Sequence, residues 1–79
     1  MKQFVATFHT HLSALMTCRA MEQAGISARM APVPRVLSSS CGTSVFYSAE
    51  SDCRGLLDED TEAVYLSDGS DYTLVLDFQ

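Results

Sequence analysis

The chain has 79 residues, of which 47% are apolar, and a formal net charge of −5. A chain of this length forms one domain at most, placed at residues 1–79, and is too short to enclose a deep active-site cavity. The few apolar residues near the start, Phe4 to Phe8, are too short a run for a membrane span or a signal sequence. We therefore expect a cytoplasmic protein with reduced thiols.

Charge is distributed unevenly along the chain. Residues 1–49 carry four basic residues against one acid, giving +3, whereas residues 50–79 carry nine acids against one base, giving −8. Because no basic stripe is present, we do not expect nucleic-acid binding. The acidic segment indicates a solvated surface, and a basic partner is the alternative interpretation.

The first third of the chain predicts a strand and a helix. Gln3–Phe8 alternates and is rich in Phe, Val and Thr, which is typical of a strand. Thr10 is a suitable N-cap, so we expect a helix over about residues 11–24, with Gly25 just beyond its end.

The helix carries two apolar faces. The stripe expected to be buried consists of Ala14, Leu15, Cys18 and Met21. A second, half-exposed face suggests contact with a partner or with a second copy of the chain, and it consists of Leu12, Met16 and Ala20.

The rest of the chain predicts four strands and a short helix. The strands are Ser27–Val33, Gly42–Ser48, Ala63–Ser67 and Tyr72–Phe78, and the short helix is Glu50–Leu57. Asp68-Gly69 indicates a hairpin between the last two strands. The order β-α-β-β-α-β, with an extra C-terminal strand, is typical of a ferredoxin-like α+β sandwich with two helices on one face of an antiparallel sheet.

This topology brings separate segments of the chain together. The turn after the first strand and the loop between the second and third strands lie at the same end of the sheet, and the third strand pairs with the first. We therefore expect His9, Thr10 and His11 to lie close to Cys41, at the positive end of the helix dipole.

The loop over residues 34–42 contains the strongest candidate for chemistry. Three serines, Cys41 and a glycine lie together at a turn, so no large neighbouring side chain shields the sulfur. A cysteine reacts readily when it is partly exposed and its thiolate is stabilised. The groups available for stabilisation are the N–H groups at the start of the helix, the charge of Arg35, and the imidazole of His9 or His11.

The small residues beside the thiol suggest access for a second protein. Ser39, Ser40 and Gly42 would let a partner's active site approach Cys41, and their hydroxyl and N–H groups are candidates to hold a persulfide anion. The alternative interpretation of the same segment is a turn that contains a small thiol residue.

The other cysteines are interpreted as structural. Cys18 lies on the buried helical stripe, and Cys53 lies in the short second helix. Spacings of 23 and 12 residues between the three cysteines match neither a disulfide framework nor a zinc pattern. His9-x-His11 with Cys41 is a weak zinc signal, so we expect no metal, and no cofactor motif is present.

Two blocks of sequence resemble a known family. The spacing of Phe8, Thr10, Ala14-Leu15 and Gly25-Ile26 follows an F-x-[ST]…AL…GI opening, and PVPR at 32–35 with SSSCG at 38–42 follows a PvPR…SSSCG signature. Over about residues 4–47 the chain resembles the selenium/sulfur (Se/S) carrier protein-like family of small bacterial proteins. The chain departs from the pattern in its short, acidic second helix, in Cys18 and in its extra C-terminal strand.

The resemblance implies that Cys41 carries sulfur or selenium as a persulfide or perselenide, with Pro34-Arg35 as the positioning or charge element. Its partners would be a donor protein and an acceptor protein. Two functions therefore remain open: a carrier related to sulfurtransferases that uses Cys41, or a non-catalytic interaction or regulatory module, since ferredoxin-like domains serve many functions.

Overall fold

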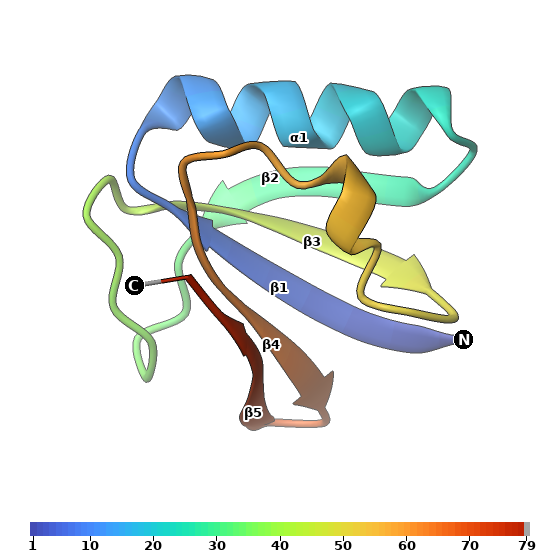
Figure 1. Ribbon diagram of the computed structural model, residues 1–79. Coiled ribbons are helices and arrows are strands. Elements are labelled where there is room, and N and C mark those ends of the chain that lie inside the picture. The colour runs from blue at the N-terminus through green and yellow to red at the C-terminus, as the bar shows by residue number, and fades with distance from the viewer. Residues whose placement is uncertain (79) are drawn as a thin grey trace.

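The computed structural model describes residues 1–78, which form one α-helix and one five-stranded sheet. The elements are β1 (Lys2–Phe8), α1 (His11–Gln23), β2 (Ser27–Pro32), β3 (Thr43–Ala49), the 3₁₀ helix η1 (Arg54–Leu56), β4 (Thr61–Asp68) and β5 (Asp71–Asp77). The strand order is β2-β3-β1-β4-β5, and every neighbouring pair is antiparallel. Figure 1 shows α1 across one face of the sheet, with the crossover from β3 to β4 on the same side.

The prediction of an α+β fold with an antiparallel sheet and an extra C-terminal strand is confirmed, but the prediction of two helices is wrong. The expected helix at Glu50–Leu57 is a loop that contains only η1. Cys53 has a left-handed φ of 57°, and the backbone N–H of Arg54 donates to Asp52 Oδ1 at 3.1 Å. The Asp52 side chain thus competes with helical hydrogen bonds for the backbone N–H of Arg54. A helix of this length is too short to be favoured over that alternative.

The crossover closes the core in place of a second helix. Cys53, Leu56 and Leu57 pack against the buried cluster from this segment. Asp58 then fastens the segment to α1, because its Oδ2 accepts a hydrogen bond from Ser13 Oγ at 2.7 Å and its backbone N–H donates to Thr17 Oγ1 at 3.0 Å.

The core lies between the sheet and α1. Phe4 of β1 stacks on Tyr47 of β3 with ring centroids 5.2 Å apart, and both side chains are buried. The Tyr47 hydroxyl donates to the Asp52 carbonyl at 2.5 Å, which satisfies the polar end of a buried ring. Burial raises the pKa of Tyr47, and the neighbouring Cys53 and Asp52 raise it further, so the phenol remains protonated.

The predicted boundaries of the helix are confirmed by its caps. Thr10 Oγ1 accepts from the N–H of Ser13 at 3.1 Å, and Gly25 follows the helix with a φ of +82°. Ala14, Cys18 and Met21 are buried as predicted, whereas Leu15 of the same predicted stripe is only half-buried. Leu12 and Met16 are exposed. Among residues 1–78, no helix has the length and apolar character needed to cross a membrane.

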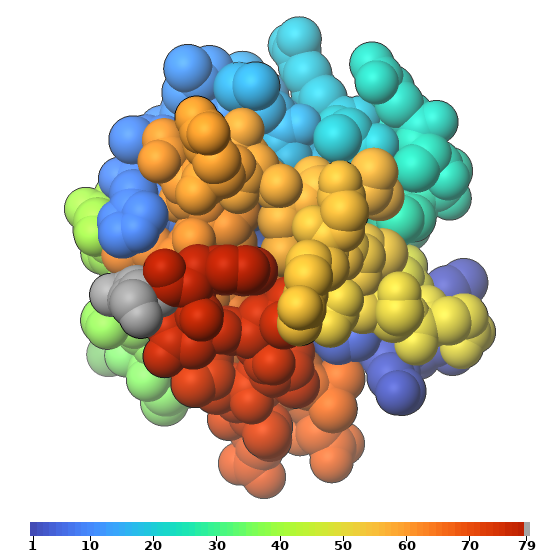
Figure 2. Space-filling view, in the orientation of Figure 1, coloured from blue at the N-terminus to red at the C-terminus, as the bar shows by residue number. Residues whose placement is uncertain are grey.

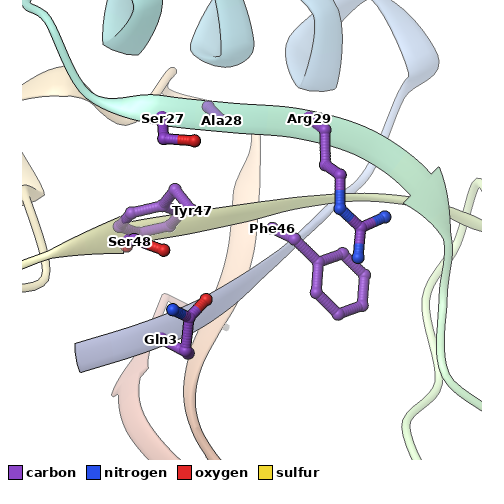
Figure 3. Close-up of a pocket in the computed structure, with 7 residues that line it drawn as sticks. All are labelled: Gln3, Ser27, Ala28, Arg29, Phe46, Tyr47 and Ser48. Carbon is purple, nitrogen blue, oxygen red and sulfur yellow. The ribbon is translucent and has the colours of Figure 1, made fainter. Parts of the chain in front are cut away.

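The opposite face of the sheet is not covered by a helix. A depression of about 110 Å³ lies there between β2, β3 and β1, and the guanidinium of Arg29 sits 4.6 Å from the centre of the Phe46 ring (Figure 3). This cation–π contact shields part of the ring from water. The depression contains no cysteine, histidine or carboxylate, so we do not assign chemistry to it.

The bond between Ser13 and Asp58 can be tested by Ser13→Ala. We expect the free energy of unfolding to fall by about 1–2 kcal/mol, because a hydrogen bond to a charged group contributes about 1.5–3 kcal/mol and alanine recovers part of this through helix propensity. Urea denaturation measures the change. The exposed control on the same helix, Arg19→Ala, should change stability by less than about 0.5 kcal/mol. Equal stability of the two variants would show that this bond does not hold the crossover.

Candidate functional site

The candidate site is the loop between β2 and β3, which carries Cys41. The ends of the loop are joined by a hydrogen bond from the N–H of Val33 to the carbonyl of Gly42 at 3.2 Å. Gly42 has a φ of +74°, a conformation that other residues rarely adopt, so a glycine suits the bend beside the cysteine. Cys41 is partly exposed, and its thiol donates to the Thr43 carbonyl at 3.6 Å.

Two serines fasten the loop to the end of the sheet. Ser39 Oγ donates to the carbonyl of Phe8 at 2.8 Å, and Ser40 Oγ donates to Glu62 Oε2 at 2.7 Å. The backbone N–H of Ser40 donates to Glu62 Oε1 at 3.2 Å. Each hydroxyl has one proton, so neither serine can donate to a bound anion unless its present bond breaks. In this structure the two serines position the loop.

Glu62 binds the Cys41 loop and holds it in place. Its side chain is only 5% exposed, and His9 Nδ1 lies 3.3 Å from Oε2 on the other side of the carboxylate. Burial alone would raise the pKa of Glu62, but the hydrogen bonds from the hydroxyl and N–H of Ser40, together with the nearby Ser39 and His9, outweigh it and hold this pKa below its usual value. The carboxylate is therefore ionised at neutral pH and joins three segments of the chain.

The expected meeting of the β1–α1 turn with the loop is seen in the structure. His9 contacts Glu62, and His11 Nδ1 lies 3.2 Å from Thr43 Oγ1. Thr10 is occupied in capping α1. Neither imidazole forms a hydrogen bond with the sulfur of Cys41 in the part of the chain that the structure describes, so the histidines lie beside the loop rather than on the thiol.

Arg35 lies at the exposed turn that begins the loop, where the N–H of Leu37 donates to the carbonyl of Pro34 at 2.9 Å. Its guanidinium forms no ion pair with any carboxylate of residues 1–78. The structure thus leaves this cation at the surface on the Cys41 loop, and its role remains a prediction.

The other thiols differ from Cys41 in their surroundings. Cys18 is buried on α1, and burial raises its pKa, with Glu22 adding to the effect. Cys53 is partly exposed, and its thiol donates to the Ser51 carbonyl at 3.5 Å. In Figure 1 the crossover near η1, where Cys53 lies, is at the opposite end of the sheet from the Cys41 loop. Cys53 is therefore not placed to form a disulfide with Cys41.

A shallow depression of about 320 Å³ lies over the loop and is lined by Ser38, Ser39, Ser40 and Glu62. Because a carboxylate forms part of its wall and two hydroxyl protons point to internal acceptors, the depression does not provide an anion-binding pocket. No group of His, Cys, Asp and Glu side chains suited to a metal ion occurs within the described residues.

Sequence reasoning missed Glu62 as part of the site. The signal available in the sequence is its position directly before the apolar Ala63-Val64 of a predicted strand, because a charged group that enters a buried strand requires partners. The sequence does not show that the partners come from Ser40 and His9.

The role of Glu62 can be tested by Glu62→Gln. At neutral pH we expect stability to fall by about 1–2 kcal/mol, because charge-assisted hydrogen bonds become neutral ones. The folded-state pKa of Glu62 lies below its unfolded value of about 4.3, so its contribution is complete above that value and is lost as the pH falls through the folded pKa.

The difference between wild type and Glu62→Gln should therefore shrink below about pH 4 in urea titrations at several pH values. The exposed control Glu59→Gln should change stability at neutral pH by less than about 0.5 kcal/mol. If the difference in stability between wild type and Glu62→Gln stayed constant down to low pH, an ionised Glu62 that holds the loop would be contradicted.

Comparison with protein-family models matches residues 3–61 to the family described as Putative Se/S carrier protein-like. The matched region includes β1, α1, β2, the Cys41 loop, β3 and the crossover, and it ends one residue before Glu62. No match was found among curated proteins or among solved structures. Since the family model covers well over half of the 79 residues, the chain belongs to the Se/S carrier protein-like family.

Proposed function

We propose that this protein carries sulfur or selenium on Cys41 and passes it to an acceptor protein. The observation that supports this most directly is the environment of the Cys41 thiol, which is partly exposed beside small residues, of which Ser39 and Ser40 bind the loop to the sheet. Membership of the Se/S carrier protein-like family supports the same conclusion. A carrier needs access for two partners in turn and does not need a deep pocket, which suits a domain of this size.

The transfer needs no net oxidation or reduction. The Cys41 thiolate attacks the outer sulfur of a donor persulfide, forming a new S–S bond at Cys41. The donor S–S bond breaks, and its electron pair leaves with the donor as a thiolate. An acceptor thiolate then attacks the outer sulfur held on Cys41, and Cys41 leaves as the thiolate. Selenium in place of the outer sulfur follows the same steps.

His11 is the proposed acceptor of the thiol proton. Its Nδ1 lies 3.2 Å from Thr43 Oγ1, and Thr43 is the residue whose carbonyl accepts the S–H of Cys41. The His11 side chain is exposed, and an imidazole can serve as a general base. Arg35, exposed on the same loop, is the proposed group to approach the persulfide anion after loading.

A protein-interaction module is the second candidate function. The observation that favours it is the pair of exposed side chains Leu12 and Met16 on the outer face of α1, which a partner or a second copy of the chain would cover. In that case Cys41 would be a turn residue without special reactivity, so measurements on the thiol separate the two functions.

Persulfide loading tests the carrier directly. After incubation with a cysteine desulfurase and cysteine, the intact protein should gain the mass of one sulfur atom, and a reductant should remove it. Cys41→Ser should abolish the gain, because the nucleophile is gone, whereas Cys53→Ser, the matched partly exposed control, should retain it. Loading that persists in Cys41→Ser, or that depends equally on Cys53, would contradict the proposal.

Thiol alkylation gives an independent prediction. With iodoacetamide at neutral pH, Cys41 should react first and Cys18 last, since Cys18 is buried and has a raised pKa. Peptide mass spectrometry after short reaction times gives the three rates. In His11→Asn the rate for Cys41 at neutral pH should fall, because the proposed proton acceptor is gone, while the rate for Cys53 should stay the same. Equal rates for Cys41 and Cys53, unchanged in His11→Asn, would favour the interaction module.

A further inference from the structure

The strand β5 forms an open edge of the sheet. Its sequence, DYTLVLD, contains no lysine, arginine or proline, the residues that commonly protect edge strands from pairing. Three apolar side chains are exposed on or next to it: Leu74 (50%), Val75 (39%) and Phe78 (47%). The other edge, β2, ends at Pro32 and contains Arg29, so the two edges differ in their readiness to accept another strand.

A groove adjoins β5 on the helix side of the sheet, near the start of the crossover that replaces the predicted second helix. Its volume is about 310 Å³, and its apolar lining comes from Phe4, Leu66 and Val75. Its polar lining comes from Lys2, Glu50, Ser51 and Asp52. Figure 2 shows β5 (red) and the crossover (yellow to orange) as neighbouring parts of one surface. An apolar side chain next to β5 could enter this groove.

The charge around this edge is negative. Asp68 and Asp71 are exposed at the hairpin end of β5, and Glu50 is exposed at the rim of the groove. The segment that contains them, residues 50–79, carries a net charge of −8. A strand that pairs here therefore meets complementary charge if lysine or arginine flanks its apolar residues.

A second copy of this chain fits the edge poorly. If two β5 strands paired antiparallel over their full length, Asp71 of one copy would lie opposite Asp77 of the other at each end, and like charges directly opposite one another are destabilising. The register of β4 and β5 also shifts next to Val75, which bends the edge. A flexible segment follows such a bend more easily than the edge of a rigid sheet.

We propose that β5 binds an extended segment of a partner protein as a sixth strand, in which alternating apolar residues are flanked by lysine or arginine. Main-chain hydrogen bonds to the edge supply affinity, and one apolar side chain occupies the groove over Val75. The added strand would run toward the Cys41 loop, because Phe78 N–H donates to the Glu62 carbonyl and Glu62 binds Ser40. This surface does not depend on the proposed carrier function.

The test uses ¹⁵N-labelled protein and two peptides, Ac-KVTVTVK-NH₂ and its acidic twin Ac-EVTVTVE-NH₂. Each peptide carries the same charge at both ends, so it can pair with β5 in a parallel or an antiparallel direction. In ¹H–¹⁵N spectra the basic peptide should shift the amides of Asp71–Leu76 and bind about tenfold more tightly than the twin. A form of the basic peptide with alternate backbone nitrogens methylated should lose binding, because it lacks the N–H donors that pair with β5. This control changes the peptide and not the protein.

Charge reversal supplies the matched comparison. Asp71→Lys should weaken binding of the basic peptide and strengthen binding of the acidic twin. Glu22→Lys makes the same change in net charge on the exposed side of α1, and it should leave the difference between the peptides intact. The proposal is overturned if both reversals act equally, if the two peptides bind alike, if methylation has no effect, or if the shifts fall on α1 or on the open face of the sheet.

Discussion

The geometry of the site depends on one buried carboxylate. Glu62 is 5% exposed and ionised, so it must be held by donors that remain in place. The donors are the hydroxyl and the N–H of Ser40, and the imidazole of His9 lies 3.3 Å from Oε2 on the other side. Ser40, which precedes Cys41, and His9, which follows β1, are thereby held against the start of β4. Displacing the loop would leave the buried charge with His9 beside it but without the two hydrogen bonds from Ser40, which is a larger penalty than the loss of an ordinary loop contact.

A bulge explains how a charged residue of β4 reaches this position. Thr7 pairs with Ala63 and Phe8 pairs with Thr61, which leaves Glu62 as the extra residue of β4. A bulge turns the side chain away from the direction that regular alternation would give it and bends the strand. Without it, the alternation that places Val64 and Leu66 toward α1 would place residue 62 toward the apolar core. The irregularity therefore makes the carboxylate available to the loop.

Most of the sheet and α1 could be predicted from the sequence because each has a local signal. Alternation in β1 and β3, the Thr10 cap and the Asp-Gly hairpin depend on neighbouring residues alone. The second helix could not be predicted reliably, since its outcome depends on competition between a short helix and the bonds of Asp52 and Asp58 to the backbone and to α1. The proximity of the turn to the Cys41 loop followed from topology. The support of that loop by Glu62 could not be predicted, because the bulge depends on the pairing of Phe8 with Thr61, which are 53 residues apart in the sequence.

The absent helix has consequences at both ends of the crossover. Near its start the crossover leaves the groove over Leu66 and Val75, where a second helix would otherwise cover the sheet. At its end the Asp60 carbonyl accepts from the N–H of His9 at 3.0 Å, which holds the turn that carries His9 against Glu62. A longer helical crossover would fill the groove and would have to recreate this turn. The same short segment thus exposes a surface beside β5 and steadies the loop with Cys41. For the proposed carrier, this combination would hold the reactive thiol at the surface while the proposed binding edge at β5 recognises a partner protein.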